Sequence, residues 1–277
     1  MRSIFTASWA VRAYIAVAAV GLTAPIIGSF LVQRRLSLIG DGIGHLAFAG
    51  VAIGVALSIA PVWGALGTAI LGALALERLR TKGRIAGDLA LAFVFYGALA
   101  FALVLLSLRH RLDASAIGVL FGNPYVASWS DVITIVVLCA VAVAAIVPFY
   151  PQLLAVALDE ETARAAGLPV DGLNLLTVTL TALLVAAGMR VVGLLLIASL
   201  LVIPIAAGSR LAHSFRRTIS WGVVVGVVSC LGGLLFALGQ GNVHPGGTMV
   251  LASIVGFVAA SFAGRRAARR HPRQAGS

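Results

Sequence analysis

The sequence predicts an all-α, polytopic transmembrane protein with eight or nine helical spans. Hydrophobic residues make up 61% of its 277 residues and charged residues only 10%, whereas about a quarter of the residues in a soluble domain are charged. Several apolar runs also reach the ~18 residues that mark a transmembrane helix. We therefore expect a single membrane domain over residues 1–277, without a second, soluble domain.

Short polar connectors separate the first four apolar runs. Arg34 and Arg35 close the first run, Pro61 separates the second from the third, and a basic connector, residues 77–88, precedes the fourth. Proline lacks the N–H that continues a helix, and clustered charges are costly in lipid. If residues 36–44 re-enter the membrane, the total falls from nine spans to eight. The expected spans are residues 11–32, 46–60, 62–76 and 89–108.

Five further runs follow a polar stretch with a Gly-Asn-Pro turn signal at residues 122–124. Pro148 and Pro151 are expected to end the first of these five runs, and the basic tail, residues 264–277, follows the last. The expected spans are residues 132–147, 173–187, 191–207, 219–238 and 249–262.

The longest polar segment covers residues 152–171, between the fifth and sixth runs. Its residues 159–166 favour a short helix, which Gly167 and Pro169 would end. This helix is too polar to span lipid, so we expect it to lie along the membrane surface.

Basic residues are distributed unevenly between the two sides that alternating spans define. Fifteen of the twenty Lys and Arg residues fall on the side that holds segment 152–171 and the C-terminal tail. Because cytoplasmic loops of membrane proteins carry the excess of Lys and Arg, we expect this side to be cytoplasmic and the N-terminus to lie outside. The same pattern accounts for the net charge of +11, so nucleic acid is not an expected partner.

The stretch of residues 37–50 places an acid and an imidazole at the mouth of the second run. Asp41 and His45 are four residues apart, so a helix presents them on one face, one turn from each other. A carboxylate and an imidazole can share a divalent cation, and ionisable groups at membrane depth are candidates for a transport pathway. Alternatively, Asp41 caps the start of the helix. The spacing alone leaves both interpretations open.

Four stretches resemble the membrane subunits of metal-ion ABC transporters, which are bacterial importers of zinc, manganese and iron. Residues 35–47 resemble the family's Arg/Met-Ser-Leu-hydrophobic-Gly-Asp-Gly-x-Ser-His-Ala signature, with Gly44 where serine is usual. Residues 192–204 resemble its Val-Gly-hydrophobic-Leu-Leu…Pro run, residues 159–168 its acidic, Ala-rich coupling segment, and residues 120–123 its Leu-Phe-Gly turn.

The resemblance implies the fold of an ABC importer permease and a set of partners. A homodimer would lie in the bacterial cytoplasmic membrane, with a separate ABC ATPase beneath it and an extracytoplasmic metal-binding protein outside. The transported ion would be zinc or manganese, with no permanently bound cofactor. Asp41 and His45 would line the metal pathway. No Walker A motif is present, which agrees with ATP hydrolysis on the partner chain.

Two further segments hold candidate site residues. Near the last span, residues 242–248 correspond loosely to an Asp-Leu-Pro-Ser-Gly-type segment, with Asn242 in place of the acid. His244 is an addition to that pattern, and it is a further candidate for metal capture on the outer side. In the coupling segment, residues 152–171, the residues expected to contact the ATPase are Asp159, Glu160, Glu161 and Arg164.

Three other functions are alternatives to metal-ion import. A permease for a metal chelate, such as a siderophore or haem, would use a wide apolar pathway without ligand residues. A secondary metal transporter or channel that works without ATP would have no use for a docking segment at residues 152–171. An intramembrane hydrolase is not expected, because the sequence has no Gly-x-Ser-x-Gly or His-Glu-x-x-His pattern. The chain itself is therefore expected not to be an enzyme.

Overall fold

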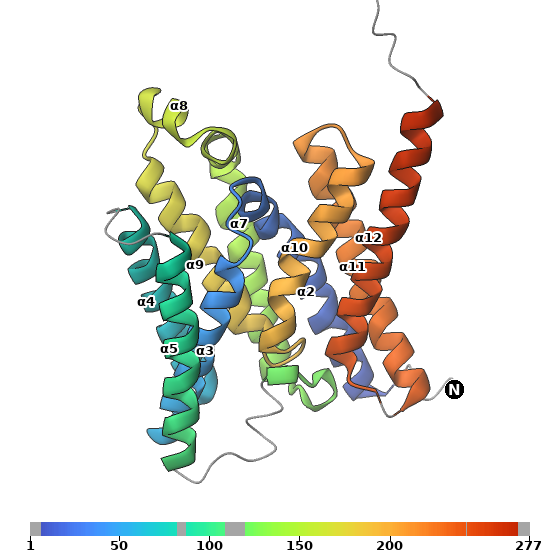
Figure 1. Cartoon of the computed structure of the whole chain (residues 1–277). Helices are drawn as coiled ribbons and strands as arrows, with labels where there is room; N and C mark the ends of the chain where they lie inside the picture. Colours follow the sequence, from blue (N-terminus) through green and yellow to red (C-terminus); the bar gives the residue numbers. More distant parts are fainter. Residues whose placement is uncertain (1–6, 82–86, 109–119, 242, 271–277) are drawn as a thin grey trace, which may run out of the picture.

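The computed structural model describes residues 7–81, 87–108, 120–241 and 243–270, and every element in these ranges is helical. Long helices run alternately up and down through one bundle (Figure 1). They are α2 (Ser8–Gln33), α3 (Ile39–Ala56), α4 (Pro61–Thr81), α5 (Gly87–Leu108), α7 (Trp129–Leu158), α9 (Val170–Gly188), α10 (Leu194–Leu211), α11 (Phe215–Gln240) and α12 (Pro245–Arg270). Two short helices join them, η1 (Pro124–Val126) and α8 (Glu160–Ala165).

The helices of the described ranges agree with the predicted spans. Eight of them are long and apolar enough to cross a membrane, and α10 has a shorter apolar part, Leu196–Leu211. The predicted all-α fold with eight or nine spans is therefore confirmed. Because α3 begins at Ile39, residues 39–44 are its first turns rather than a separate re-entrant segment.

The predicted end of the fifth span at Pro148 and Pro151 is wrong, because α7 continues through both residues to Leu158. A proline removes one helical hydrogen bond and crowds the preceding turn, but membrane helices tolerate this where other groups satisfy the freed carbonyls. Both prolines are exposed, so their rings do not disturb the buried packing. Residues 152–158 consequently belong to α7, and the polar connector before α9 is shorter than the predicted segment 152–171.

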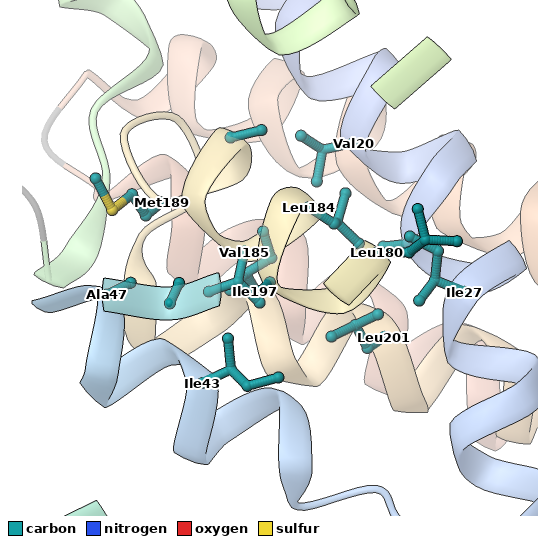
Figure 2. Packing of buried hydrophobic residues seen from close by; sticks show 14 of the residues in the cluster. Val20, Ile27, Ile43, Ala47, Leu180, Leu184, Val185, Met189, Ile197 and Leu201 are labelled. Carbon is teal, nitrogen blue, oxygen red and sulfur yellow. The ribbon is translucent and has the colours of Figure 1, made fainter. Parts of the chain in front are cut away.

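The centre of the bundle is formed by α2, α3, α9 and α10, with α4 and α5 on one side and α11 and α12 on the other (Figure 1). The apolar window of α3 is 72% buried, whereas that of α5 is 11% buried. α3, which carries Asp41 and His45, therefore lies inside the bundle, and α5 covers one face of it. Figure 2 shows the central contacts, which include Val20 and Ile27 of α2, Ile43 and Ala47 of α3, Leu180 and Leu184 of α9, and Ile197 and Leu201 of α10.

A close helix crossing holds α3 against α4. A Cβ atom at Gly50 or at Gly64 would collide with the backbone carbonyl of the other glycine. Close to this crossing, the Thr68 hydroxyl of α4 donates a hydrogen bond to the Leu46 carbonyl at 2.9 Å. Small residues allow helices in a membrane to approach until backbones touch, and here the backbones of α3 and α4 meet at Gly50 and Gly64.

A junction of three connectors lies at the end of the bundle opposite α8 (Figure 1). Gly122 and Gly193 have φ angles of +71° and +99°, and a Cβ atom at either would collide with the backbone of the other segment. A Cβ atom at Gly246 would collide with the carbonyl of Val192. The Leu-Phe-Gly and Val-Gly stretches of the sequence are therefore two sides of one contact, in which glycine supplies both the backbone angle and the space.

Candidate functional site

Asp41 and His45 lie on one face of the first two turns of α3. The distance from Asp41 Oδ1 to His45 Nε2 is 3.9 Å, and the two side chains are 34% and 4% exposed. This distance is longer than a hydrogen bond. Two ligands of one tetrahedral zinc ion, each about 2.0–2.2 Å from it, lie roughly 3.4 Å apart. The separation of the two atoms is therefore close to that of two ligands on one ion.

Capping does not explain the position of Asp41. The N-cap residue of α3 is Leu38, and no side chain accepts a capping hydrogen bond there. Asp41 is the third residue of the helix, where a carboxylate gains from the positive end of the helix dipole. The alternative role as an N-cap thus lacks the hydrogen bond on which it depends, and the carboxylate is available to a ligand.

Side chains of α5 cover the Asp41–His45 pair. The Phe95 ring packs on the His45 imidazole, with ring centroids 3.9 Å apart and planes at 54°, and Tyr96 packs edge-on against Phe95 at 5.0 Å. His45 Nδ1 is buried without a hydrogen-bond partner, so the aromatic contact rather than a hydrogen bond sets the ring orientation. Asp41 opens into a pocket whose other lining residues are Leu38, Leu91, Ala92, Phe95 and Tyr96.

The described part of one chain supplies two candidate metal ligands at this place. No group of three or more His, Cys, Asp or Glu side chains is close enough to hold a metal in these ranges, whereas zinc takes four ligands. The third candidate, His244, precedes α12 and is exposed, with its ring 6.0 Å from that of Phe121. The structure therefore brings Asp41 and His45 together but does not bring His244 to them.

The predicted coupling residues lie together on α8, at one end of the bundle (Figure 1). Asp159 is the N-cap of α8, and its Oδ1 accepts hydrogen bonds from the amides of Glu161 and Thr162, each at 3.1 Å. The Thr162 hydroxyl donates to the same carboxylate, and these hydrogen bonds hold the pKa of Asp159 below its ordinary value. Glu160 and Glu161 fill the first turn, where negative charge is favoured.

Ion pairs tie α8 to the rest of the bundle. Glu160 Oε2 lies 3.0 Å from Arg34 Nη2 at the end of α2, and Glu160 Oε1 accepts a hydrogen bond from Asn174 Nδ2 of α9 at 3.3 Å. Arg164 pairs with Asp171 at 2.8 Å. Sequence reasoning missed the contacts of Arg34, Asn174 and Asp171. Arg34 is 126 residues from Glu160, whereas Asn174 and Asp171 are only 14 and 7 residues from their partners but lie on a different helix. A charged residue at a helix end gives no signal of its partner.

Comparison with known proteins gives one family. The model of the ABC 3 transport family matches residues 7–264. A probable metal transport system membrane protein of Treponema pallidum is 34% identical over 88% of this chain and 91% of that protein. The high-affinity zinc uptake system membrane protein ZnuB of Haemophilus influenzae is 27% identical, over 87% of this chain and 92% of its own length. The manganese transport system membrane protein MntC of Listeria monocytogenes is 30% identical, over 91% and 90% of the two chains.

A solved structure has the same fold. A chain of PsaBC from Streptococcus pneumoniae, determined in complex with a Fab, superimposes with a TM-score of 0.86 at 27% identity. The match covers 97% of each chain. The two proteins therefore share the arrangement of helices around α3, and the match extends over nearly the whole length of both.

Proposed function

Because the chain belongs to the ABC 3 transport family, we propose that it is the membrane-spanning permease subunit of an ATP-driven importer that carries zinc or manganese ions into the cytoplasm. The observation that carries this proposal is the Asp41–His45 pair on the buried helix α3. The resemblance of residues 35–47 and the names of two relatives support the same assignment.

The chemistry of the pair suits a metal ion in transit. An ion that enters apolar surroundings must exchange water ligands for protein ligands, because an unpaired charge in such surroundings costs many kcal/mol. Asp41 offers an anionic oxygen and His45 a buried nitrogen. In a homodimer, a second copy would double this set to two carboxylates and two imidazoles, the number of ligands that zinc takes. Mixed nitrogen and oxygen ligands also suit manganese, so they do not select between the two ions.

We assign one partner to each end of the bundle. The ATPase would dock on α8, whose Glu161 and Arg164 are exposed, and this end would face the cytoplasm together with the basic C-terminal tail. The binding protein would deliver metal to the opposite end, at the three-glycine junction of Gly122, Gly193 and Gly246. A chelate permease is less well supported, because a chelated metal needs no ligand pair in the pathway.

Transport by the assembled importer tests the proposal. Membrane vesicles would carry the chain together with a candidate ABC ATPase and a candidate extracytoplasmic binding protein. Radioactive zinc or manganese should enter only with ATP and with all three components present. Uptake without ATP would favour a secondary transporter, and uptake of siderophore-bound iron alone would favour a chelate permease.

A further inference from the structure

A partly buried ion pair joins α8 to the end of α2. Arg34 Nη2 lies 3.0 Å from Glu160 Oε2, and the Arg34 side chain is 7% exposed while that of Glu160 is 35% exposed. Charge-assisted hydrogen bonds of this length are among the stronger polar contacts in proteins. Because the arginine is removed from water, parting the two groups costs more than parting a pair on the surface.

Glu160 is held from a second direction by α9. Its Oε1 accepts a hydrogen bond from Nδ2 of Asn174, a fully buried residue, at 3.3 Å. On the underside of α8, Ala163 is also buried. The two carboxylate oxygens of Glu160 therefore contact two different helices, and Oε1 also lies 3.6 Å from Arg164 Nη2 of α8 itself. A shift of α8 along the membrane surface would therefore pull on Arg34.

The connection from Arg34 to the metal ligands is short and has a defined geometry. Arg34 is the C-cap of α2, and Arg35 adopts a left-handed φ of +58°. The Arg35 amide donates to the Val32 carbonyl at 3.1 Å and the Leu36 amide to the Leu31 carbonyl at 2.9 Å. These two hydrogen bonds form the Schellman motif that closes a helix end.

The start of α3 follows directly from this turn. The Ile39 amide donates to the Leu36 carbonyl at 3.0 Å, and the Gly42 amide donates to the Leu38 carbonyl at 3.1 Å. Asp41 lies in the first turn of α3, next to these bonded positions. Hydrogen-bonded turns connect α2 to α3 without a loose loop, so a displacement of Arg34 reaches Asp41 through a stiff piece of backbone.

We propose that the Glu160–Arg34 ion pair transmits a displacement of α8 to the Asp41–His45 pair, and that both residues are positioning residues for transport. The proposal rests on the proposed function, because it takes α8 as the element that the ATPase moves. ATP-driven movement at α8 then changes the position of Asp41 relative to α5 and the second copy. Metal release and ATP hydrolysis are coupled through this contact.

The Arg164–Asp171 ion pair provides a matched comparison. It also involves α8, with a distance of 2.8 Å, but it joins α8 to the start of α9, and its side chains are 54% and 67% exposed. Exposed pairs contribute little because water and salt screen them. Removing the Asp171 charge should therefore leave coupling intact, although the substitution lies at the same end of the bundle.

The test uses the complete importer in proteoliposomes, with four forms of the chain: wild type, Arg34→Gln, the conservative Arg34→Lys, which keeps the charge, and the control Asp171→Asn. Co-purification of the ATPase, ATP hydrolysis and radioactive zinc or manganese uptake are measured on each. In Arg34→Gln, the ATPase should remain bound and hydrolyse ATP, while metal uptake per ATP falls at least about tenfold. Arg34→Lys should retain most of the uptake, and Asp171→Asn should match the wild type.

Three results would overturn the proposal. They are wild-type uptake per ATP in Arg34→Gln, loss of the ATPase from that variant, which would make the pair a docking contact, and a loss of uptake in Arg34→Lys as large as that in Arg34→Gln. Failure of the proposed function is separate, because it appears in the wild-type complex as an absence of ATP-dependent zinc or manganese uptake.

Discussion

Asp41 Oδ1 faces His45 Nε2 across 3.9 Å on α3, with the imidazole beneath the carboxylate and almost fully buried. The Asp41→Asn substitution keeps the size of the side chain and removes its charge. If Asp41 is a metal ligand, zinc or manganese uptake should fall at least about tenfold, the lower range seen for weakened metal sites. The amount of protein in the membrane should stay normal, because Asp41 makes no capping hydrogen bond.

His45→Gln should reduce uptake in the same way. The double variant should be little worse than either single variant, since both residues serve one site and their effects are not additive. Radioactive metal uptake, normalised to protein level, measures all three variants. Wild-type uptake in Asp41→Asn would end the proposal that this pair binds the transported ion.

Phe95 holds the His45 ring by an aromatic contact, with ring centroids 3.9 Å apart. We expect Phe95→Leu to preserve the fold, because leucine is apolar and fills much of the same space. Without the stacked ring, His45 is free to rotate away from Asp41. The apparent KM for metal uptake should therefore rise several-fold, with a smaller change in the maximal rate. An unchanged KM would show that the histidine needs no support from α5.

The positions of the helices could be predicted from the sequence because apolar runs of sufficient length have one stable state in lipid. Helix ends were harder to predict. In a water-soluble protein Pro148 and Pro151 would predict the end of a helix, yet α7 passes through both. The i, i+4 spacing of Asp41 and His45 gave their common face correctly, because helix periodicity is a local property.

Contacts between distant segments could not be predicted. Phe95 looks like any other apolar residue of its run, and the sequence does not show that it meets His45. The pairing of Arg34 with Glu160 depends on how α2, α8 and α9 pack, and nothing near either residue specifies it. The glycines of the Leu-Phe-Gly and Val-Gly stretches were visible as motifs, but their mutual contact appeared only in three dimensions.

Chemical labelling tests which end of the bundle faces the cytoplasm. Cysteines introduced by Glu161→Cys on α8 and Val243→Cys before α12 lie at opposite ends of the bundle. Because basic residues concentrate at the α8 end, an impermeant thiol reagent added outside should label position 243 and spare position 161. The native Cys139 and Cys230 are buried, so the background should be low. Labelling of position 161 from outside would reverse the proposed orientation.

Docking of the ATPase on α8 predicts a charge effect at Glu161, which is exposed in the first turn of the helix. Glu161→Lys should reduce co-purification of the ATPase, whereas Glu161→Gln, which keeps the shape, should reduce it less. Neither variant alters a buried contact, so both should reach the membrane in normal amounts. Equal recovery of the ATPase with Glu161→Lys and with wild type would contradict docking through this charge.

The N-cap of α8 predicts how pH affects this helix. Hydrogen bonds from the Thr162 hydroxyl and from two amides lower the pKa of Asp159 below its ordinary value of 3.8. A carboxylate whose folded pKa is lowered stabilises the fold fully above its unfolded pKa, and this contribution is lost as pH falls through the folded pKa. Protection of the Glu161 and Thr162 amides against hydrogen exchange should therefore decrease when the pH falls below 3.8. Asparagine also caps helices but does not titrate, so Asp159→Asn should keep its protection over the same range. A parallel loss in that variant would assign the pH effect to other groups.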